Sequence, residues 1–539
     1  MISLLLVTLS LFQDPAPTAP APRIDDLRAT ARVLGLELTD AELTLMGKNI
    51  DEQRVGYAEV RKVPLTNADA LAFTFQPLLP GMHVRANTLA AAPRELPKVD
   101  RPANVDDLAY ASIPTLGALL RAKQVTCSEL VELSLARLQR LDPQLHHVVT
   151  LCSDRARAQA KVLDAELQQG KLRGPLHGIP WGAKDLLATK GIRTTYGAKP
   201  FEDQVLDEDA AVVERLDAAG AILVAKLSLG ELAMGDGWFG GQTRNPWKPA
   251  QGSSGSSAGP AAAVASGCVT FAIGSETCGS ILSPSARCGC SSLRPTFGRI
   301  SRHGAMALSW TMDKLGPMAR SAADAAIVFA AINGHDPRDD STTQQPHHDL
   351  GPIGVQGFKV GWLADGWSNA KDRDALLDEL RALGCEIVPL QLPKLPYQAL
   401  MPILLAEAAT AFDDLTRSGK DDQLAQQRED SWPNAFRSAQ LVPAVEYLRA
   451  SRVRRRAMLA FDAVLQQVDV MVHPTGHGTL LVLCNLTGQP AVCVPRGFRA
   501  DGTPRSVTFT ANLYNEARAL ALAEAWQRST HDHERHPPL

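Results

Sequence analysis

A unit of helix, glycine and buried strand recurs along this chain and limits the folds open to it. Residues 210–227, AAVVERLDAAGAILVAKL, carry helix-forming residues up to a glycine and then a β-favouring apolar run, and residues 380–392, LRALGCEIVPLQL, repeat this order. The short apolar runs CVTFAIG (268–274) and VDVMVHPT (468–475) are typical of further buried strands. Helices that alternate with short buried strands predict an α/β fold in which helices cover a central sheet.

The first hundred residues differ from the rest in composition. The apolar run ISLLLVTLSLF and the tract DPAPTAPAPR, within residues 1–23, predict an export signal and a proline-rich spacer, although a positively charged start is missing. Residues 24–105 combine helical patterns, which run from about Ile24 to Arg85, with a linker. Residues 106–539 form the main domain. We expect an exported protein without stable membrane insertion, since no other segment is apolar enough to cross a bilayer; a cytoplasmic location is the alternative.

Charge and cysteine content exclude several classes of function. The 539 residues include 55 Lys and Arg against 58 Asp and Glu, a net charge of −3 without a long basic block, which argues against a nucleic-acid partner. Nine dispersed cysteines make an odd count that is not a disulfide framework. The sequence has no paired Cys-x-x-Cys, no His-Glu-x-x-His and no phosphate-loop motif, which argues against the commonest metal and phosphate sites and leaves Cys288 with Cys290, and His473 with His477, as weak metal candidates.

Residues 251–285, QGSSGSSAGPAAAVASGCVTFAIGSETCGSILSPS, place serine and glycine around two apolar stretches. Such a run is a flexible linker, a phosphate-cradling loop or the site of a reactive hydroxyl. The alanine-rich helix pattern and the apolar strand pattern inside it favour a packed core, where glycine allows tight turns and close backbone approach. We therefore expect these residues to lie inside the fold.

A reactive serine hydroxyl needs a group that takes its proton, and the sequence offers no obvious histidine for this role. The neutral amine of Lys184, in GIPWGAKDLLA, can serve if burial lowers the lysine pKa from about 10.4 by roughly three units. The neighbouring residues leave a surface lysine paired with Asp185 as the alternative.

Taken together, Lys184, Ser256 and Ser280 with their flanking residues resemble the amidase signature family. The resemblance extends from about Tyr110 to the end of the chain and includes FGGQTRNPW (239–247), LRPTFGRISRHGAMALSWTMDKLGPMARS (293–321) and NLTGQPAVCVP (485–495). In that family the bridging serine lies 24 positions before the nucleophile, which follows a glycine. Ser280 follows glycine and therefore selects Ser256, rather than Ser253 or Ser254.

The resemblance implies a fold and a set of roles. The fold is a large mixed, mostly parallel central sheet with helices on both faces. Ser280 is the nucleophile, Ser256 relays its proton to neutral Lys184, and the Gly255–Ser256 peptide bond is cis. The backbone N–H groups that hold the oxyanion belong to Thr277, Cys278, Gly279 and Ser280. Supporting residues are Gly255, Ser257 and Ser275. The implied activity is hydrolysis of a small-molecule or peptide carboxamide, without a cofactor.

Several alternatives stay open on the sequence. Many relatives have glycine or aspartate where this chain has Cys278, whose thiol narrows the acyl pocket, packs inward, or is itself the nucleophile with Glu276 and Lys184. The chain is alternatively the amidase subunit of a tRNA-dependent amidotransferase, or a non-catalytic binding protein that keeps the fold. The particular amide, any esterase activity, cleavage of the signal segment and the oligomeric state, including a homodimer, are not determined by the sequence.

Overall fold

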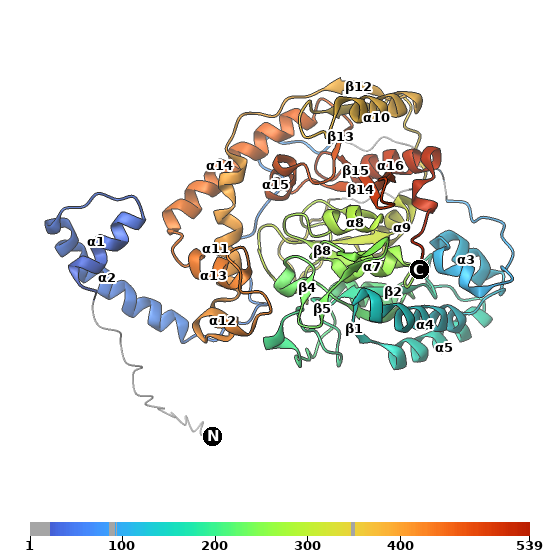
Figure 1. Cartoon of the computed structure of the whole chain (residues 1–539), viewed down its shortest axis with the longest axis horizontal. Helices are drawn as coiled ribbons and strands as arrows, with labels where there is room; N and C mark the ends of the chain where they lie inside the picture. The colour runs from blue at the N-terminus through green and yellow to red at the C-terminus, as the bar shows by residue number, and fades with distance from the viewer. Residues whose placement is uncertain (1–21, 86–91, 93, 346–350) are drawn as a thin grey trace, which may run out of the picture. The chain divides into compact units, whose positions relative to one another are not determined.

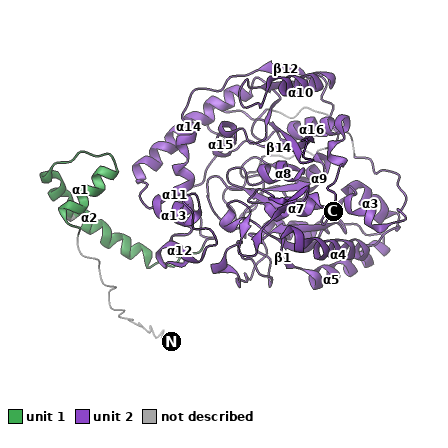
Figure 2. Cartoon of the chain, in the orientation of Figure 1, with its two compact units in different colours: residues 1–66 green, residues 67–539 purple. Residues whose placement is uncertain are grey.

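The computed structural model describes residues 22–85, 92, 94–345 and 351–539. It divides the chain into two compact units, residues 1–66 and 67–539, which Figure 2 shows in different colours. The predicted signal segment and most of the proline-rich spacer lie outside the described residues. Residues 67–105, which the sequence assigns to the amino-terminal region, fall in the second unit.

The described part of the first unit is a pair of helices that pack on each other, α1 (Ile24–Val33) and α2 (Asp40–Arg61). Thr39 begins α2 with a capping box, in which the Thr39 hydroxyl and the Glu42 carboxylate each accept a backbone N–H of the other residue. The helical pattern expected as far as Arg85 is wrong beyond Arg61, since residues 62–85 contain no helix. Pro64, Pro77 and Pro80 interrupt this stretch, and proline removes a helix hydrogen bond.

The second unit is built on a mixed sheet of eleven strands among the described residues (Figure 1). In spatial order the strands are β1 (Val148–Leu151), β3 (Ile222–Leu227), β2 (Pro180–Lys184), β8 (Phe271–Glu276), β10 (Lys314–Ala319), β9 (Ser291–Arg294), β14 (Ala491–Phe498), β15 (Pro504–Thr510), β13 (Val470–Pro474), β11 (Lys359–Trp362) and β12 (Glu386–Pro389). The central strands are buried on both faces, which explains their nearly continuous apolar sequences.

The strand pairing agrees with the predicted mixed sheet but differs in the proportion of parallel and antiparallel pairs. The parallel pairs are β2–β3, β2–β8, β11–β12 and β11–β13. The antiparallel pairs are β1–β3, β8–β10, β9–β10, β9–β14, β13–β15 and β14–β15. Parallel pairs, which the resemblance implies should predominate, are therefore the smaller group. The parallel group that matters for the site is β3–β2–β8, in which all three strands end at the same edge.

Helices cover both faces of the sheet, as expected. Helices α7 and α8 pack on each other and on central strands, and α9 and α16 form a second such pair (Figure 1). The helices of this unit are α3 (Ile113–Arg121), α4 (Cys127–Leu145), α5 (Ser153–Gln168), α6 (Ala211–Ala218), α7 (Ala258–Ala265), α8 (Leu282–Cys288), α9 (Ala322–Ile332), α10 (Ala370–Ala382), α11 (Pro402–Ala411), α12 (Asp413–Arg417), α13 (Trp432–Ala439), α14 (Ala444–Leu465), α15 (Gly478–Thr487) and α16 (Glu516–Thr530). Every residue of α7 is buried, so a helix without a polar face fits this position.

Two short hairpins lie between β3 and α7 in the sequence. They are β4 (Gly237–Trp238) with β5 (Gly241–Gln242), and β6 (Arg244–Asn245) with β7 (Lys248–Gly252). β7 includes the first two residues of the glycine- and serine-rich run, which then continues into α7, β8 and α8. The run is therefore part of the packed fold rather than a linker.

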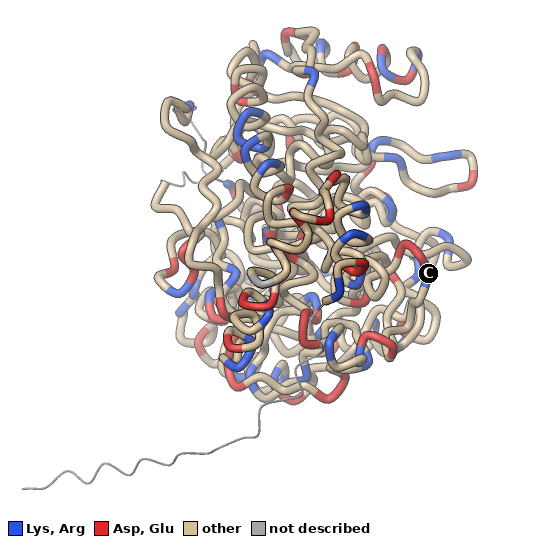
Figure 3. The backbone as a smooth tube through the Cα atoms, turned by 90° about the vertical axis from the view of Figure 1, so that its left-hand side faces the viewer, with Lys and Arg blue, Asp and Glu red and all other residues tan. Residues whose placement is uncertain are grey.

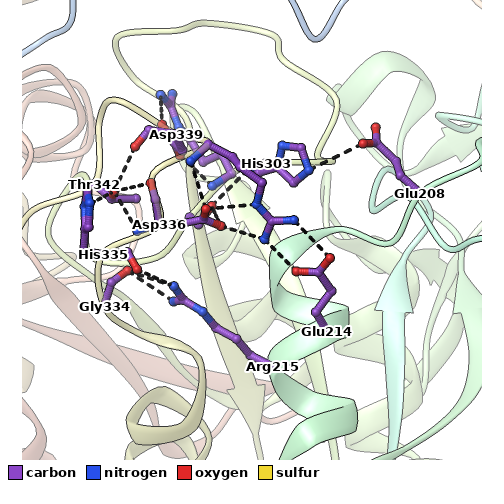
Figure 4. A network of polar contacts seen from close by, with 12 residues as sticks. Glu208, Glu214, Arg215, His303, Gly334, His335, Asp336, Asp339 and Thr342 are labelled. Carbon is purple, nitrogen blue, oxygen red and sulfur yellow. Dashed lines mark hydrogen bonds and ion pairs between the residues drawn. The ribbon is translucent and has the colours of Figure 1, made fainter.

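Surface and loop charges are paired locally. In Figure 3 acidic and basic residues are interspersed along the backbone, in keeping with a net charge of −3. Figure 4 shows one polar network, around Glu214 on α6 and Asp336. The Arg338 guanidinium, which the figure does not label, donates to both carboxylates. Arg215 donates to the carbonyl oxygens of Gly334 and His335 in the same loop. These contacts fix the loop after α9 onto α6. In the part of the chain that the structure describes, no helix has the length and apolar character needed to cross a membrane.

Candidate active site

Two parallel strands bring a lysine and a serine to the same edge of the sheet. Lys184 is the last residue of β2, and Ser275 is the last but one of the neighbouring strand β8. The Lys184 Nζ atom lies 2.8 Å from Ser275 Oγ and 3.4 Å from the Ser275 carbonyl oxygen. The carboxyl ends of parallel strands are where ligand sites of α/β sheets generally form.

Lys184 also contacts the predicted relay serine, with Nζ 2.8 Å from Ser256 Oγ. The lysine side chain is completely buried. Burial lowers its pKa to about 7, although the negative charges of Asp313 and Glu276 oppose this shift. A lysine with such a pKa is largely neutral just above pH 7 and can then accept a proton.

The alternative of a surface lysine paired with Asp185 is wrong. Asp185 lies in the turn directly after β2 and pairs with Lys226 of β3 rather than with the Lys184 amine. Its carboxylate lies 2.9 Å from Lys226 Nζ, and its second oxygen accepts the backbone N–H of Thr195 at 2.9 Å. Both Asp185 and Lys226 are buried, so this ion pair belongs to the core.

Ser256 lies two residues before α7, and the Gly255–Ser256 peptide bond is cis, as the resemblance implies. A Cβ atom at Gly255 would come within 1.7 Å of the carbonyl oxygen of Gly235, so only glycine fits there. The Gly230 N–H donates to the Ser256 carbonyl oxygen at 3.2 Å. The loop after β3 therefore holds the backbone of Ser256 in place.

Ser257 forms hydrogen bonds with both Ser280 and Ser275. Its backbone N–H donates to the Ser280 carbonyl oxygen at 3.0 Å, which places Ser280 beside Ser256 and Ser257. The Ser257 hydroxyl donates to the Ser275 carbonyl oxygen at 3.1 Å and accepts the Ser275 N–H at 3.2 Å. By contrast, the Ser253 hydroxyl bonds the Ser254 carbonyl oxygen. No hydrogen bond within the described residues joins Ser253 to Lys184.

The turn that follows β8 contains the predicted nucleophile. Ser280 is half-buried, and its hydroxyl has no hydrogen-bond partner among the residues that the structure describes. Within the same described part of the chain, no acceptor is found for the backbone N–H groups of residues 277–280. Gly279 has a φ of 104°, a conformation that other residues rarely adopt. The turn thus presents a hydroxyl and free backbone donors together.

Glu276 holds the turn of residues 277–280 through its carboxylate, a role that the sequence did not predict. One carboxylate oxygen accepts the N–H groups of Ile281 and Leu282 at 2.8 and 3.0 Å, and the other accepts from Arg294 and Asn485 at 2.8 and 2.9 Å. Burial opposes ionisation of Glu276, but the Arg294 guanidinium outweighs it and lowers the carboxyl pKa to about 2. Glu276 is therefore a charged anchor that spans both ends of the turn.

Asp313 fixes the other side of the turn and was likewise not predicted. The Thr277 hydroxyl donates to Asp313 Oδ1 at 2.6 Å, while Asp313 Oδ2 accepts the N–H groups of Leu308 and Ser309 at 2.8 and 2.9 Å. Asp313 follows Ser309 in ALSWTMD, and an acidic residue just before a buried strand was the available signal. Sequence spacing cannot connect it to Thr277, which lies 36 positions earlier.

This arrangement can carry out acyl transfer. A neutral buried amine within hydrogen-bond distance of a serine hydroxyl is a base for that hydroxyl, and backbone N–H groups of a turn can bind a developing oxyanion. The fold and site thus define an α/β protein in which a buried amine, serine hydroxyls and free backbone donors lie together at one edge of the sheet.

Comparison with known proteins identifies the family. The family model described as Amidase matches residues 129–479. The chain is 35% identical over 476 residues to the A subunit of glutamyl-tRNA(Gln) amidotransferase from Anaeromyxobacter dehalogenans, covering 78% of this chain and 96% of that one. This protein belongs to the amidase signature family.

Solved structures of the family have the same fold. The native peptide amidase from Stenotrophomonas maltophilia superposes with a TM-score of 0.73 at 32% identity, covering 80% of this chain and 99% of that one. The A subunit of glutamyl-tRNA(Gln) amidotransferase from Thermotoga maritima gives a TM-score of 0.65 at 25% identity, covering 80% and 97%. Both relatives are covered almost completely, and each leaves about a fifth of this chain unmatched.

Proposed function

We propose that this protein is an amidohydrolase that cleaves a linear carboxamide through a covalent ester on Ser280. The observation that carries the proposal is the 2.8 Å contact between the buried Lys184 amine and Ser256 Oγ. A peptide amidase among the solved relatives supports small amides and amidated peptides as the substrate class.

The first half-reaction forms the ester. Ser280 Oγ attacks the carboxamide carbonyl and gives its proton to Ser256 Oγ, whose own proton passes to the neutral Lys184 amine. The carbonyl oxygen becomes an oxyanion that the N–H groups of residues 277–280 stabilise. The C–N bond then breaks, and the proton held by Lys184 returns through Ser256 to the leaving nitrogen, which departs as ammonia or an amine.

The second half-reaction uses water in place of the serine. Water gives its proton to the same Ser256–Lys184 pair and attacks the ester carbonyl. The Ser280–acyl bond breaks, the proton returns to Ser280 Oγ, and the product leaves as a carboxylic acid. The acid gives the second proton of the water molecule to the solvent or to the released ammonia or amine and becomes a carboxylate.

The alternative nucleophile, Cys278, is disfavoured by its surroundings. Burial raises the pKa of the Cys278 thiol to about 11, and the negative charge of Glu276 acts in the same direction. The thiol is the weak nucleophile and the thiolate the strong one, so this cysteine is largely unreactive near neutral pH. Cys278 instead packs, half-buried, against the hydrophobic core.

Labelling and turnover of one variant test the proposal. We expect a fluorophosphonate to label the wild type and not Ser280→Ala, and we expect ammonia release from a panel of amides to disappear in the same variant. Cys278→Ser is the matched control, because it alters the same turn and should keep both signals. Labelling that survives in Ser280→Ala and is lost in Cys278→Ser would overturn the assignment. Absence of both signals from the wild type would favour a non-catalytic binding protein.

A second candidate function rests on the amidotransferase relative, which is 35% identical over nearly its whole length. In that case the chain is the amidase subunit of a tRNA-dependent complex. The test is co-purification of partner subunits from the native source together with hydrolysis of glutamine. A chain that purifies alone and hydrolyses other amides in preference to glutamine supports the amidohydrolase.

We further propose that the protein is exported, on the basis of the apolar run in residues 1–12 and the proline-rich spacer. Amino-terminal sequencing of the protein recovered from fractionated cells tests this. A mature chain that begins near the spacer supports export, and an intact Met1 in the cytoplasmic fraction contradicts it.

A further inference from the structure

An extended segment that precedes the family match contacts the residues that support the candidate site. We call residues 67–85 the strap. It consists of turns and bends without helix or strand, and it belongs to the same compact unit as the sheet. The family match begins at residue 129, so the strap lies outside the residues that the family model matches.

The first anchor of the strap is Asn67. Its side-chain amide donates to the Ala307 carbonyl oxygen at 2.9 Å and accepts the Ala307 N–H at 2.6 Å. A carboxamide is the side-chain group that can donate to and accept from one peptide unit in this way. Asn67 thereby fixes the backbone at the start of the segment Ala307–Asp313.

The second anchor is Phe75, which lies between a cation and another ring. The Arg454 guanidinium of α14 stands 3.7 Å from the centre of the Phe75 ring, and Phe297 meets the same ring edge-on at 5.1 Å between centroids. A guanidinium over an aromatic face is attracted by the ring, more strongly where water is excluded. The Arg454 side chain is buried, so Phe75 provides one of the walls of its site.

Arg454 in turn holds the far end of the same segment. Its Nη1 donates to Thr311 Oγ1 and its Nη2 to the Thr311 carbonyl oxygen, both at 2.8 Å. From the opposite side, Glu407 of α11 accepts the Ser309 hydroxyl at 2.6 Å and the Thr311 N–H at 3.1 Å. The segment Ala307–Asp313 is therefore clamped between the strap and the helices α11 and α14.

Asp313, at the end of this segment, accepts the Thr277 hydroxyl, and Thr277 is the first residue of the turn that presents Ser280. We propose that Asn67 and Phe75 are positioning residues for amide hydrolysis, which hold Ala307–Asp313, and through Asp313 the oxyanion-binding turn, in the reactive geometry. This inference rests on the proposed function, because it assigns the turn the oxyanion role. It makes the strap a working part of the enzyme rather than a tether for the amino-terminal helices.

The test uses full-length variants and two kinetic readouts. We compare Asn67→Ala and Phe75→Leu with Phe73→Leu, a matched control because Phe73 is 60% exposed and two positions away. We measure kcat and KM on the best amide, the rate constant of fluorophosphonate labelling at Ser280, and urea unfolding. Labelling itself forms a tetrahedral adduct whose oxygen occupies the oxyanion site.

We expect kcat and the labelling rate constant of both strap variants to fall about tenfold, with KM nearly unchanged, because misplaced reacting groups lower the rate more than binding. Phe75→Tyr, which keeps the ring under Arg454, should restore both rates, and Phe73→Leu should match the wild type. A purely structural role would shift the urea midpoint and leave the rates of the folded protein unchanged.

The outcomes separate this inference from the proposed function. Wild-type kcat and labelling rates in both strap variants, with turnover that still depends on Ser280, overturn the strap inference alone. Turnover or labelling that is undiminished in Ser280→Ala overturns the proposed function, and the strap inference with it.

Discussion

At the scale of single residues, Lys184 is the group whose protonation controls the proposed reaction. Its amine is buried against two serine hydroxyls, and burial lowers its pKa to about 7, with Asp313 and Glu276 acting in the opposite direction. The neutral amine is the active form. We therefore expect kcat/KM to rise as pH increases through about 7 and to level off above it, in a pH–rate profile measured on a neutral amide.

Two variants show whether that inflection belongs to Lys184. Lys184→Met should lower kcat by 10² to 10⁴, roughly the contribution of a general base. Lys314 is a matched control, since it is also buried and burial likewise lowers its pKa to about 7. Lys314→Met should keep the inflection near pH 7. A profile that is flat between pH 6 and 8 in the wild type would contradict a neutral lysine base.

Glu276 supports the site through charge, and its removal should cost stability. The residue is paired with buried Arg294 and accepts two N–H groups of the turn. Glu276→Gln leaves that guanidinium without its partner, so we expect about 3–5 kcal/mol less free energy of unfolding at pH 7. The folded pKa, about 2, lies below the usual 4.5, so this contribution is present above pH 4.5 and is lost as the pH falls towards 2.

The measurement is urea unfolding of both proteins at pH 7 and near pH 3. The difference between wild type and Glu276→Gln should shrink at the lower pH. Glu132→Gln is the control, because the Glu132–Arg157 pair is about half exposed, and it should change stability by less than about 1 kcal/mol. Equal effects of the two substitutions would mean that burial does not strengthen the Glu276 contacts.

The sequence indicated which residues lie together at this edge of the sheet better than it indicated the contacts that hold them there. Lys184, Ser256 and Ser280 could be found because each lies in a local motif, and the spacing of 24 selected one serine among several. Glu276 entered only as a partner of a cysteine nucleophile, and Asp313 did not enter at all. Their partners, Asn485 and Thr277, lie 209 and 36 positions away and meet them only once the sheet has formed.

At the scale of elements, the local patterns predicted most helices and strands and failed where proline and tertiary contacts decide. The unit 210–227 became α6 and β3, and the unit 380–392 became the end of α10 followed by β12. Residues 67–85, for which the sequence pattern predicts helix, instead form the strap. The strap side chains contact other residues of the second unit. The apolar residues of the strap contact segments that are distant in the sequence. The periodicity of apolar residues alone does not distinguish such a strap from a helix.

Close packing of α7 against β8 gives a prediction about Gly274. A Cβ atom at this position would lie 2.7 Å from Ser257 Oγ and 2.8 Å from Met318 Sδ. Gly274→Ala must therefore displace Ser257, whose hydroxyl bonds the backbone of Ser275 beside Lys184. We expect a loss of about 1–3 kcal/mol of stability from overpacking, together with a lower kcat.

Urea unfolding and steady-state kinetics check this prediction, with Gly354→Ala as the control. No atom lies within 4 Å of a Cβ built at Gly354, and its backbone conformation suits alanine. That variant should match the wild type in both measurements. If Gly274→Ala lost stability and kept its kcat, the link from α7 through Ser257 to Ser275 would not matter for the reaction.

At the scale of the whole molecule, all nine cysteines are free in the fold. Eight are buried and Cys278 is half-buried. Burial raises the pKa of Cys152 and of Cys278 to about 11, which leaves little thiolate near neutral pH. We therefore expect a thiol-specific reagent to find nine groups in denaturant and at most one, reacting slowly, in the native protein.

This count bears on the proposal of export, because exported proteins meet an oxidising environment in which exposed thiols pair. A chain whose thiols are shielded by its own core can remain reduced there without a disulfide framework. The decisive sample is protein recovered from the exported fraction, denatured without reductant in the presence of an alkylating agent. Nine alkylated cysteines would agree with the fold. Seven or fewer would mean that a disulfide forms outside the cell, and that the packing around the pair involved differs from the structure described.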